Sequence, residues 1–347
     1  MSKTRQKREE KIAVCNKKAF YTCRSLFGYN DVFFYLIVGG RDTGKSYAVM
    51  DRFLRDFKTK GIPFYWLRLT DKIASFMLQN NAAKMIDADL VRKYDLELTV
   101  KGCEVFDHGV KMAEVMGISN FYNMKGTATF DCEWKKGYNI CLDECQREVG
   151  EAVRFDLSYA LVNALENYVR DTKEKLRIVF ICNYTETVSD IMNLFNFIPE
   201  KWGRYHLAKK KAVVDFLPPT ERYKERRDGS VADILMPNAS TFSNQKVYDK
   251  TLVYKGRLRK PLYRLDFEDE QYVVWQGVSG ENVIRMLKQG EKVTKIIAMT
   301  PYQSAKLYDA KVVKNIYAIF DACGYRYVDL ITQQRFTMAL AKLKTRK

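Results

Sequence analysis

A glycine-rich loop between an apolar run and a helical run constrains the fold of this chain more than any other feature of its sequence. Residues 32–38 have the sequence VFFYLIV, and such aromatic and β-branched runs are typical of strands buried on both faces. The loop GGRDTGKS follows directly, fits the pattern G-x-x-x-x-G-K-[ST], and leads into the helical sequence YAVMDRFLRDF. A strand, this loop and a helix in that order predict an α/β domain built around a phosphate-binding P-loop.

The residue types of this loop fit a nucleoside triphosphate. Glycines let backbone N–H groups approach phosphate oxygens, and the N-terminus of the following helix adds the positive end of its dipole. We expect Lys45 to reach the β- and γ-phosphates of ATP and Ser46 to ligate Mg²⁺. The flanking strand and helix disfavour a chance match. The loop residues expected to bind ATP are Gly39, Gly40, Arg41, Asp42, Thr43, Gly44, Lys45 and Ser46.

Two adjacent acids end a second apolar run, ICLDE at residues 140–144, which has the form of a Walker B motif. In this interpretation Asp143 holds the Mg²⁺ shell and Glu144 polarises the attacking water as general base. The alternative is that both acids cap the next helix, because carboxylates are favoured at helix N-termini. A third run, RIVFIC, ends at Asn183, which either senses the γ-phosphate or lies in an ordinary turn.

Apolar runs at residues 64–69, 138–142 and 177–182 alternate with segments long enough for crossover helices, which predicts a largely parallel sheet. The acid pair is expected of NTPases that place an additional strand between the two motifs. Residues 47–139 leave room for more than one additional βα unit. Apolar residues recur at four-residue steps between residues 147 and 170, which predicts an amphipathic helix.

Proline and charge are concentrated in LPPTERYKERRDG at residues 217–229, a composition typical of a linker. We therefore divide the chain into a basic N-terminal extension, an ATPase domain, a linker and a smaller C-terminal domain. Strand-like runs after the linker and helical stretches at residues 306–323 and 333–343 predict an α+β fold for the last part. The predicted boundaries are 1–24, 25–205, 206–244 and 245–347.

Composition narrows the class of protein further. Hydrophobic residues make up 47% and charged residues 29% of the chain, as in ordinary globular proteins. No apolar run approaches the ~20 residues that span a bilayer, and the first residues lack the apolar centre of a signal peptide, so we expect a cytoplasmic protein with no membrane partner. The 8 cysteines include no CxxC pair, which disfavours a zinc site, and we expect Cys141 and Cys182 to be free buried thiols.

Positive charge is concentrated outside the predicted catalytic motifs. The formal net charge is +17. Residues 1–24 carry eight Lys/Arg and two acids, and residues 201–265 carry sixteen Lys/Arg and six acids. In contrast, residues 25–200 carry twenty-two Lys/Arg and twenty-five acids. This distribution favours a polyanionic partner such as nucleic acid, although a solvated basic surface is the alternative.

At these motifs the sequence resembles the small genome-packaging ATPases of phi29-like tailed phages. The P-loop of that family also carries an arginine at the position of Arg41, and the helix after its Walker B motif is similar to YALVNALENYVR at residues 159–170. The resemblance extends from about Phe33 to Trp202. It implies an additional-strand P-loop ATPase domain and a C-terminal domain that resembles a vestigial RNase H-like nuclease.

The resemblance also implies roles that the motifs alone do not assign. Arg170 aligns with the trans-acting arginine finger of the family, and Lys125 aligns with a lysine upstream of its Walker B motif. Arg68 and Lys72 lie near the DNA-gripping loop of the family and are predicted DNA contacts. The basic N-terminal extension and an insertion between Lys125 and Asp143 depart from the family pattern. Two basic clusters are alternative contacts for DNA or for an acidic portal surface: Lys209–Lys211, and Arg222, Lys224, Arg226 and Arg227.

The implied function is packaging of double-stranded DNA into a viral procapsid, driven by ATP hydrolysis. The resemblance implies a ring of five copies at the portal vertex in the host cytoplasm, and leaves open whether a structural RNA takes part. Alternatives are another P-loop DNA translocase or helicase loader, a small-molecule P-loop kinase, and a non-enzymatic nucleic-acid-binding protein. The basic flanks disfavour the kinase, and the intact motifs disfavour the non-enzymatic protein.

Nuclease activity is not expected of the C-terminal domain. Asp266, Glu268 and Asp269 cluster in the sequence, but two-metal nuclease chemistry needs carboxylates that converge from several elements. Asp309 and Asp321 are isolated on a helical stretch. We expect the cluster to lie on a surface strand.

Overall fold

The structure is a computed structural model with two compact units, each built on its own sheet. The first unit comprises Met1–Phe195 and Pro199–Lys246, and the second comprises Asn196–Ile198 and Val247–Lys347. Each unit is described by itself. The structure describes residues 20–29, 31–119, 138–145, 157–169, 176–183, 190–218, 221, 225, 228–235 and 250–345.

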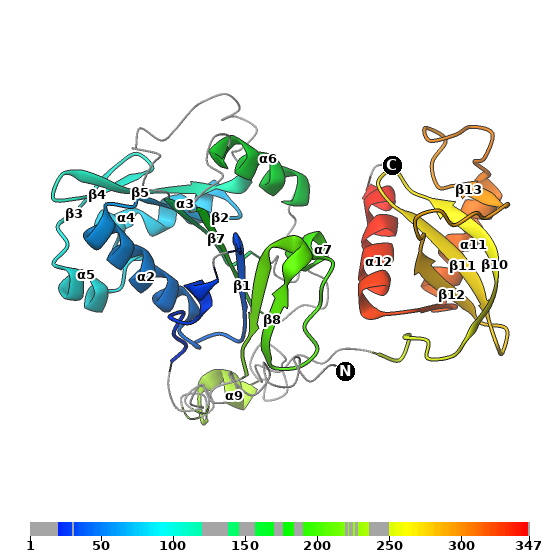
Figure 1. The fold of residues 1–347 in the computed structure, drawn as a ribbon, viewed down its shortest axis with the longest axis horizontal. Coiled ribbons are helices and arrows are strands. Elements are labelled where there is room, and N and C mark those ends of the chain that lie inside the picture. Colours follow the sequence, from blue (N-terminus) through cyan, green and yellow to red (C-terminus); the bar gives the residue numbers. More distant parts are fainter. Residues whose placement is uncertain are drawn as a thin grey trace. The chain divides into compact units, whose positions relative to one another are not determined.

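The first unit contains a 9-stranded sheet with the order β3-β4-β5-β2-β6-β7-β1-β9-β8 (Figure 1). From β5 to β9 all neighbouring strands are parallel, and antiparallel pairs flank them at both edges, which confirms the predicted largely parallel sheet. The strands are β1 (Phe34–Val38), β2 (Phe64–Arg68), β3 (Leu98–Lys101), β4 (Glu104–Asp107), β5 (Val110–Gly117), β6 (Tyr138–Asp143), β7 (Leu176–Cys182), β8 (Gly203–Leu207) and β9 (Ala212–Phe216).

The strand order confirms the predicted additional-strand architecture. The P-loop follows β1, and the acid pair of the Walker B motif lies at the end of β6. Strand β7 pairs in parallel with both, so one strand separates the two motif strands. The carboxyl ends of parallel strands meet at one edge of a sheet, which brings the residues after β1, β6 and β7 together.

Helices pack against both faces of this sheet (Figure 1). The helix α2 starts at the P-loop, and its Phe53 packs against Phe64 and Trp66 with ring centroids 5.5 Å and 6.3 Å apart. On the other face, Phe195 of α7 packs against Phe34 of β1 at 5.4 Å. The helices are α2 (Lys45–Lys60), α3 (Asp71–Met77), α4 (Gln79–Ala82), α5 (Ala88–Tyr94), α6 (Leu157–Val169), α7 (Asp190–Phe195) and α9 (Val231–Leu235), with short 3-10 turns at η1 (Leu26–Gly28) and η4 (Ala208–Lys210).

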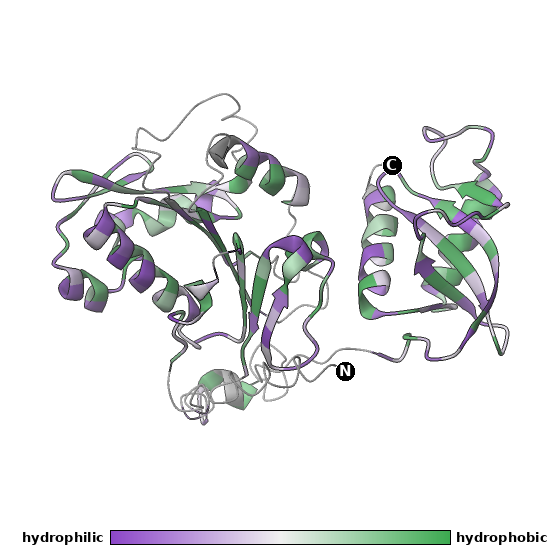
Figure 2. Ribbon diagram, viewed as in Figure 1, coloured by the Kyte–Doolittle hydropathy of each residue, from purple (hydrophilic) through white to green (hydrophobic). Residues whose placement is uncertain are grey.

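The sequence pattern explains why α2 forms where it does. Val49, Phe53 and Leu54 recur at helical spacing and are fully buried. The helix as a whole contains both hydrophobic and hydrophilic residues, whereas the neighbouring strand β1 is hydrophobic (Figure 2). Gly61 ends the helix in a left-handed conformation with φ of 65°, and its N–H donates to the carbonyls of Asp56 and Phe57. Among the described helices of the chain, none is long and apolar enough to span a bilayer.

Two parts of the first unit differ from the predictions. Residues 206–244 were predicted to be a linker, but β8 and β9 belong to the first sheet, where Phe34 of β1 pairs with Ala212 of β9. The proline-rich composition that suggested a linker begins only at residue 217. Residues 47–139 leave room for more than one additional βα unit, but residues 98–117 within that segment form an antiparallel meander, in which Gly102 and Gly109 make tight turns with φ of 62° and 75°.

The second unit has a 5-stranded mixed sheet with the order β13-β10-β11-β12-β14. Its core surrounds Phe336, whose ring lies 5.2 Å from that of Tyr272 and 5.7 Å from that of Phe267. The likeness to a vestigial nuclease stays a prediction. The elements are β10 (Leu258–Asp266), β11 (Gln271–Gly277), β12 (Asn282–Met286), β13 (Ile296–Ala298), α11 (Ala310–Asp321), β14 (Tyr325–Tyr327) and α12 (Leu330–Thr345).

Candidate active site

The P-loop leaves the sheet at the end of β1 and enters α2 at Lys45. The N–H of Gly39 donates to the carbonyl of Cys182 at 3.1 Å, which fixes the start of the loop beside β7. Asp42 and Gly44 adopt left-handed conformations with φ of 56° and 82°. Left-handed residues in such a loop are typical of backbone nests that bind anions, and a helix N-terminus adds positive potential.

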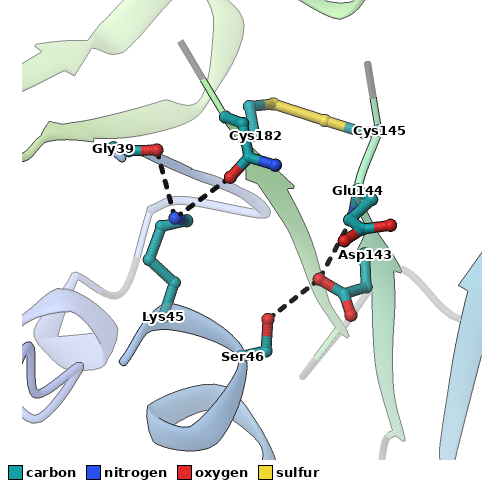
Figure 3. Close-up of a disulfide and its surroundings, with 8 residues drawn as sticks. Gly39, Lys45, Ser46, Asp143, Glu144, Cys145 and Cys182 are labelled. Atoms are coloured by element: carbon teal, nitrogen blue, oxygen red, sulfur yellow. Dashed lines mark hydrogen bonds between the residues drawn. A yellow bond between two sulfur atoms is a disulfide. The ribbon is translucent and has the colours of Figure 1, made fainter. Parts of the chain in front are cut away.

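Lys45 ends this loop and begins α2, and its ammonium group is buried among oxygen acceptors (Figure 3). Its Nζ donates to the carbonyl of Gly39 at 3.1 Å, to Thr43 Oγ1 at 3.3 Å and to Asn183 Oδ1 at 3.3 Å, and also to the carbonyl of Gly40. Burial lowers the pKa of Lys45 to about 8, against the opposing attraction of nearby carboxylates. The group therefore remains largely charged near neutral pH.

Ser46 and Asp143 meet where α2 begins and β6 ends (Figure 3). Ser46 Oγ donates to Asp143 Oδ1 at 3.0 Å, although the two residues are 97 positions apart in the chain. A hydroxyl and a carboxylate beside a phosphate-binding loop form the oxygen donor set that Mg²⁺ prefers. These two residues therefore fit the predicted cation.

Arg68 lies at the end of β2 and contacts both acids of the Walker B motif. Its NH1 donates to Asp143 Oδ2 at 3.0 Å, and its NH2 donates to the carboxylate of Glu144. The predicted DNA contact of Arg68 does not fit this geometry, because the side chain is only 11% exposed and its charge is used within the site. We correct that prediction: Arg68 belongs to the candidate active site.

Of the other predicted catalytic and DNA-binding residues, two lie within the described part of the chain and two lie outside it. Asn183 follows β7 and contacts Lys45, so it lies within the site. Lys72 is exposed in the first turn of α3, where it remains a predicted DNA contact. Lys125 and Arg170 lie outside the described residues, and their roles stay predictions.

The two basic clusters are described only in part. Lys209, Lys210 and Lys211 are exposed around η4, and Lys210 donates to the carbonyl of Leu194 at 3.2 Å. Arg222, Lys224, Arg226 and Arg227 lie outside the described residues.

A disulfide joins the ends of β6 and β7 (Figure 3). Cys145 is bonded to Cys182, and their Cα atoms are 5.4 Å apart. The predicted free thiol at Cys182 is therefore wrong, because β6 and β7 are parallel neighbours and Cys145 lies just beyond the end of β6, within reach of Cys182. Cys141 is a free buried thiol as predicted, and burial raises its pKa.

A short segment before β1 packs on the P-loop, and the sequence did not predict this contact. The N–H of Tyr21 donates to the carbonyl of Thr43 at 3.0 Å, and Phe20 lies so close to Gly44 that an added Cβ would come within 3.0 Å of it. The Tyr21 hydroxyl donates to Asp215 of β9 at 2.8 Å. Residues 20–24, predicted to belong to a separate extension, are therefore part of the support of the loop.

In the second unit, two of the acids near the end of β10 are bound by arginines. Arg264 donates to both oxygens of Asp266 at 2.7 Å, and Arg335 pairs with Glu270. Glu268 and Asp269 are exposed. Within the described ranges of the chain, no group of three His, Cys, Asp or Glu residues is arranged to hold a metal ion.

Comparisons with known proteins agree with this architecture. A family model described as Podovirus DNA encapsidation protein (Gp16) matches residues 15–287. The structure of the Phi-28 gp11 DNA packaging motor aligns with a TM-score of 0.63 and 16% identity over 91% of this chain and 96% of that chain. The bacteriophage Phi-29 viral genome packaging motor assembly aligns with a TM-score of 0.63 and 18% identity over 93% of this chain and 99% of that chain. At these identities the structural likeness is one of fold. Comparison with curated protein sequences gives no match.

Proposed function

Because this chain belongs to the podovirus DNA encapsidation protein (Gp16) family, we propose that it hydrolyses ATP to move double-stranded DNA into a viral procapsid. The observation that carries the proposal is the convergence of Lys45, Ser46, Asp143 and Glu144 at one edge of the first sheet. These side chains come from the start of α2 and the end of β6, and they supply the cation, the metal ligands and the base that phosphoryl transfer requires. The same groups on a chain of this family favour a packaging motor over a kinase or a helicase loader.

The site residues divide the chemistry between them. Lys45 and the N–H groups of the P-loop bind the β- and γ-phosphates, and Ser46 and Asp143 hold Mg²⁺. When bound, Mg²⁺ neutralises charge on the phosphates. Glu144 accepts a proton from the attacking water, and Asn183, which contacts Lys45 at 3.3 Å, orients groups near the γ-phosphate.

Glu144 must exchange one partner for another before it can act as a base. Its carboxylate is paired with Arg68, whereas a general base must lie within hydrogen-bond reach of the water. We infer that Arg68 restrains Glu144 until nucleotide and DNA are both in place.

The chain after Arg68 connects this restraint to a predicted DNA contact. Lys72 lies four positions further on, exposed at the start of α3. Asp71 anchors that turn, because its Oδ1 accepts from the N–H of Gly117 at 2.9 Å. Contact of DNA phosphates with Lys72 would therefore act on β2 and Arg68 through a short, fixed segment.

We propose a ring of five copies at the portal vertex in the host cytoplasm, with Arg170 acting on the nucleotide of the neighbouring copy. The helix that leads to Arg170 supports an interface there: on α6, Tyr159 is 52% exposed and Val162 is 46% exposed, one turn apart. Lys125 is the next candidate for a trans-acting cation.

The rate of ATP hydrolysis with and without double-stranded DNA tests the enzymatic proposal. We expect DNA to stimulate hydrolysis by the wild-type chain, and Lys45→Ala to abolish ATP binding because the phosphates lose their buried cation. Wild-type ATP affinity in Lys45→Ala would contradict the P-loop assignment.

Mixed rings test the trans-acting arginine. Arg170→Ala should bind ATP normally yet lose about 10³-fold or more in hydrolysis, the effect of losing an arginine finger. Mixing it with Glu144→Gln subunits should restore some activity, because some interfaces then combine an intact Glu144 with an intact Arg170. Full activity of assembled Arg170→Ala rings in the presence of DNA would remove Arg170 from the mechanism.

A further inference from the structure

Two cysteines lie at the ends of neighbouring strands, each next to a proposed catalytic residue. Cys145 follows Glu144 after β6, and Cys182 precedes Asn183 at the end of β7. Both are fully buried, and their sulfur atoms are bonded (Figure 3). The bridge therefore crosses the pair of strands that carries the base and the amide of the site.

Backbone hydrogen bonds connect this bridge to the rest of the site. The N–H of Cys145 donates to the carbonyl of Ile181 at 3.1 Å, and the carbonyl of Cys182 accepts from the first glycine of the P-loop, Gly39, at 3.1 Å. Glu144 has a positive φ of 52°, which residues other than glycine rarely adopt. A covalent bond at the next residue restrains the backbone that directs the Glu144 carboxylate.

In the bridged structure that carboxylate is paired with Arg68. We propose that Cys145 and Cys182 form a redox-controlled site: the disulfide holds Glu144 in its Arg68-paired state and slows ATP hydrolysis, and reduction to two thiols releases it. The inference rests on the proposed ATPase function and adds a modification site to it. The reactants are a peroxide as oxidant and a dithiol as reductant.

The chemistry balances with hydrogen peroxide as the oxidant. A thiolate attacks one peroxide oxygen, so an S–O bond forms, the O–O bond breaks, and a sulfenic acid and one water result. The second thiol then displaces the second water, so an S–S bond forms and the S–O bond breaks. The two thiols lose two electrons and two protons, and a dithiol reverses the step by exchange. In reducing compartments such bridges are transient and redox-sensing.

The experiment compares the full chain after treatment with hydrogen peroxide and after treatment with dithiothreitol. Mass spectrometry of unreduced peptides measures the bridge, and steady-state hydrolysis measures kcat. We expect bridged protein to bind ATP with unchanged Kd and to hydrolyse it about ten- to a hundredfold more slowly, because a misplacement of about 1 Å costs up to about a hundredfold in rate. Dithiothreitol should restore the rate.

Cysteine variants give the matched controls. Cys145→Ser and Cys182→Ser should each keep the same kcat with and without peroxide. Among the described residues, Cys103 and Cys323 are exposed thiols that should not matter, so the Cys103→Ser/Cys323→Ser double variant should respond as the wild type does.

Each contrary outcome has a distinct meaning. Equal kcat in wild-type protein shown to be bridged and in reduced protein would overturn the inference, and this comparison needs no variant to fold. Peroxide treatment that oxidises Cys103 and Cys323 without forming the bridge would overturn it too. Absence of hydrolysis in both forms would instead overturn the proposed ATPase function, and the inference with it.

Discussion

The pairing of Arg68 with both Walker B acids predicts the behaviour of an Arg68→Ala variant. Arg68 and Asp143 are 3.0 Å apart, and their side chains are 11% and 7% exposed. Removing one partner of a buried pair leaves an uncompensated charge and costs about 3–5 kcal/mol. We therefore expect the free energy of unfolding of the variant, without nucleotide, to fall by about 3 kcal/mol, the lower end of that range because the pair is not fully buried.

Mg²⁺ and nucleotide should change this result. With Mg²⁺ and a non-hydrolysable ATP analogue present, Asp143 gains a new cationic partner, so the ligands should stabilise the variant more than they stabilise the wild type. Urea unfolding with and without the two ligands measures the difference. Glu144 is 54% exposed, so its bond to Arg68 is worth at most about 1 kcal/mol. In Arg68→Ala, Glu144 is released from this bond, which should raise the DNA-independent rate of hydrolysis by up to about fivefold and weaken stimulation by DNA.

The control is a buried pair away from the site. Arg52 Nε lies 3.0 Å from Asp56 Oδ2, with side chains 15% and 2% exposed, and Asp56 keeps Arg177 as a partner. Arg52→Ala should therefore lose less stability and should gain no more from Mg²⁺ and analogue than the wild type does. An Arg68→Ala protein that these ligands stabilise only as much as the wild type would refute the proposed role of Arg68.

Three single groups carry the remaining predictions. Glu144→Gln should keep the wild-type Kd for ATP but hydrolyse it about a hundredfold or more slowly, because an amide cannot accept the proton of the water; a near-normal single-turnover rate would identify another base. Burial lowers the pKa of Lys45 to about 8 in the folded chain, so ATP affinity should be full below that pH and weaken above it; a Kd that is constant between about pH 7 and pH 9.5 would contradict this. Above about pH 8, Lys45 loses its proton in the folded chain but keeps it in the unfolded chain. The contribution of Lys45 to the free energy of unfolding should therefore rise with pH until the unfolded lysine also deprotonates. Arg204→Ala should cost about 3–5 kcal/mol in urea unfolding, because Asp215, which is 1% exposed, loses a two-point ion pair; a loss below about 1 kcal/mol would show that Tyr21 alone satisfies this carboxylate.

The parts of the site that the sequence predicts are those whose chemistry is local. The P-loop is encoded within a few consecutive residues, and its flanks indicate the strand and the helix that present it. The acid pair at residues 143 and 144 is recognisable for the same reason, because a buried strand ends directly before it. The largely parallel sheet follows from the alternation of apolar runs with long connecting segments.

What the sequence does not predict depends on pairing between distant segments. Arg68 is 75 positions from Asp143, and nothing near it in the sequence indicates that it would bind acids instead of DNA. Cys182 meets Cys145 only because β6 and β7 are neighbours in parallel. In contrast, the turns at Gly102 and Gly109 are local signals of a hairpin, and they could have indicated the antiparallel edge.

Packaging of DNA by a reconstituted system tests the central claim most directly. Empty procapsids, double-stranded DNA, ATP and the wild-type chain are combined, and the DNA that becomes protected from added nuclease is measured. We expect protection that requires ATP and is lost when Glu144→Gln replaces the wild type, because this chain would then bind ATP without using it. Equal protection without ATP, or with Glu144→Gln in place of the wild type, would contradict the claim that hydrolysis at this site moves the DNA.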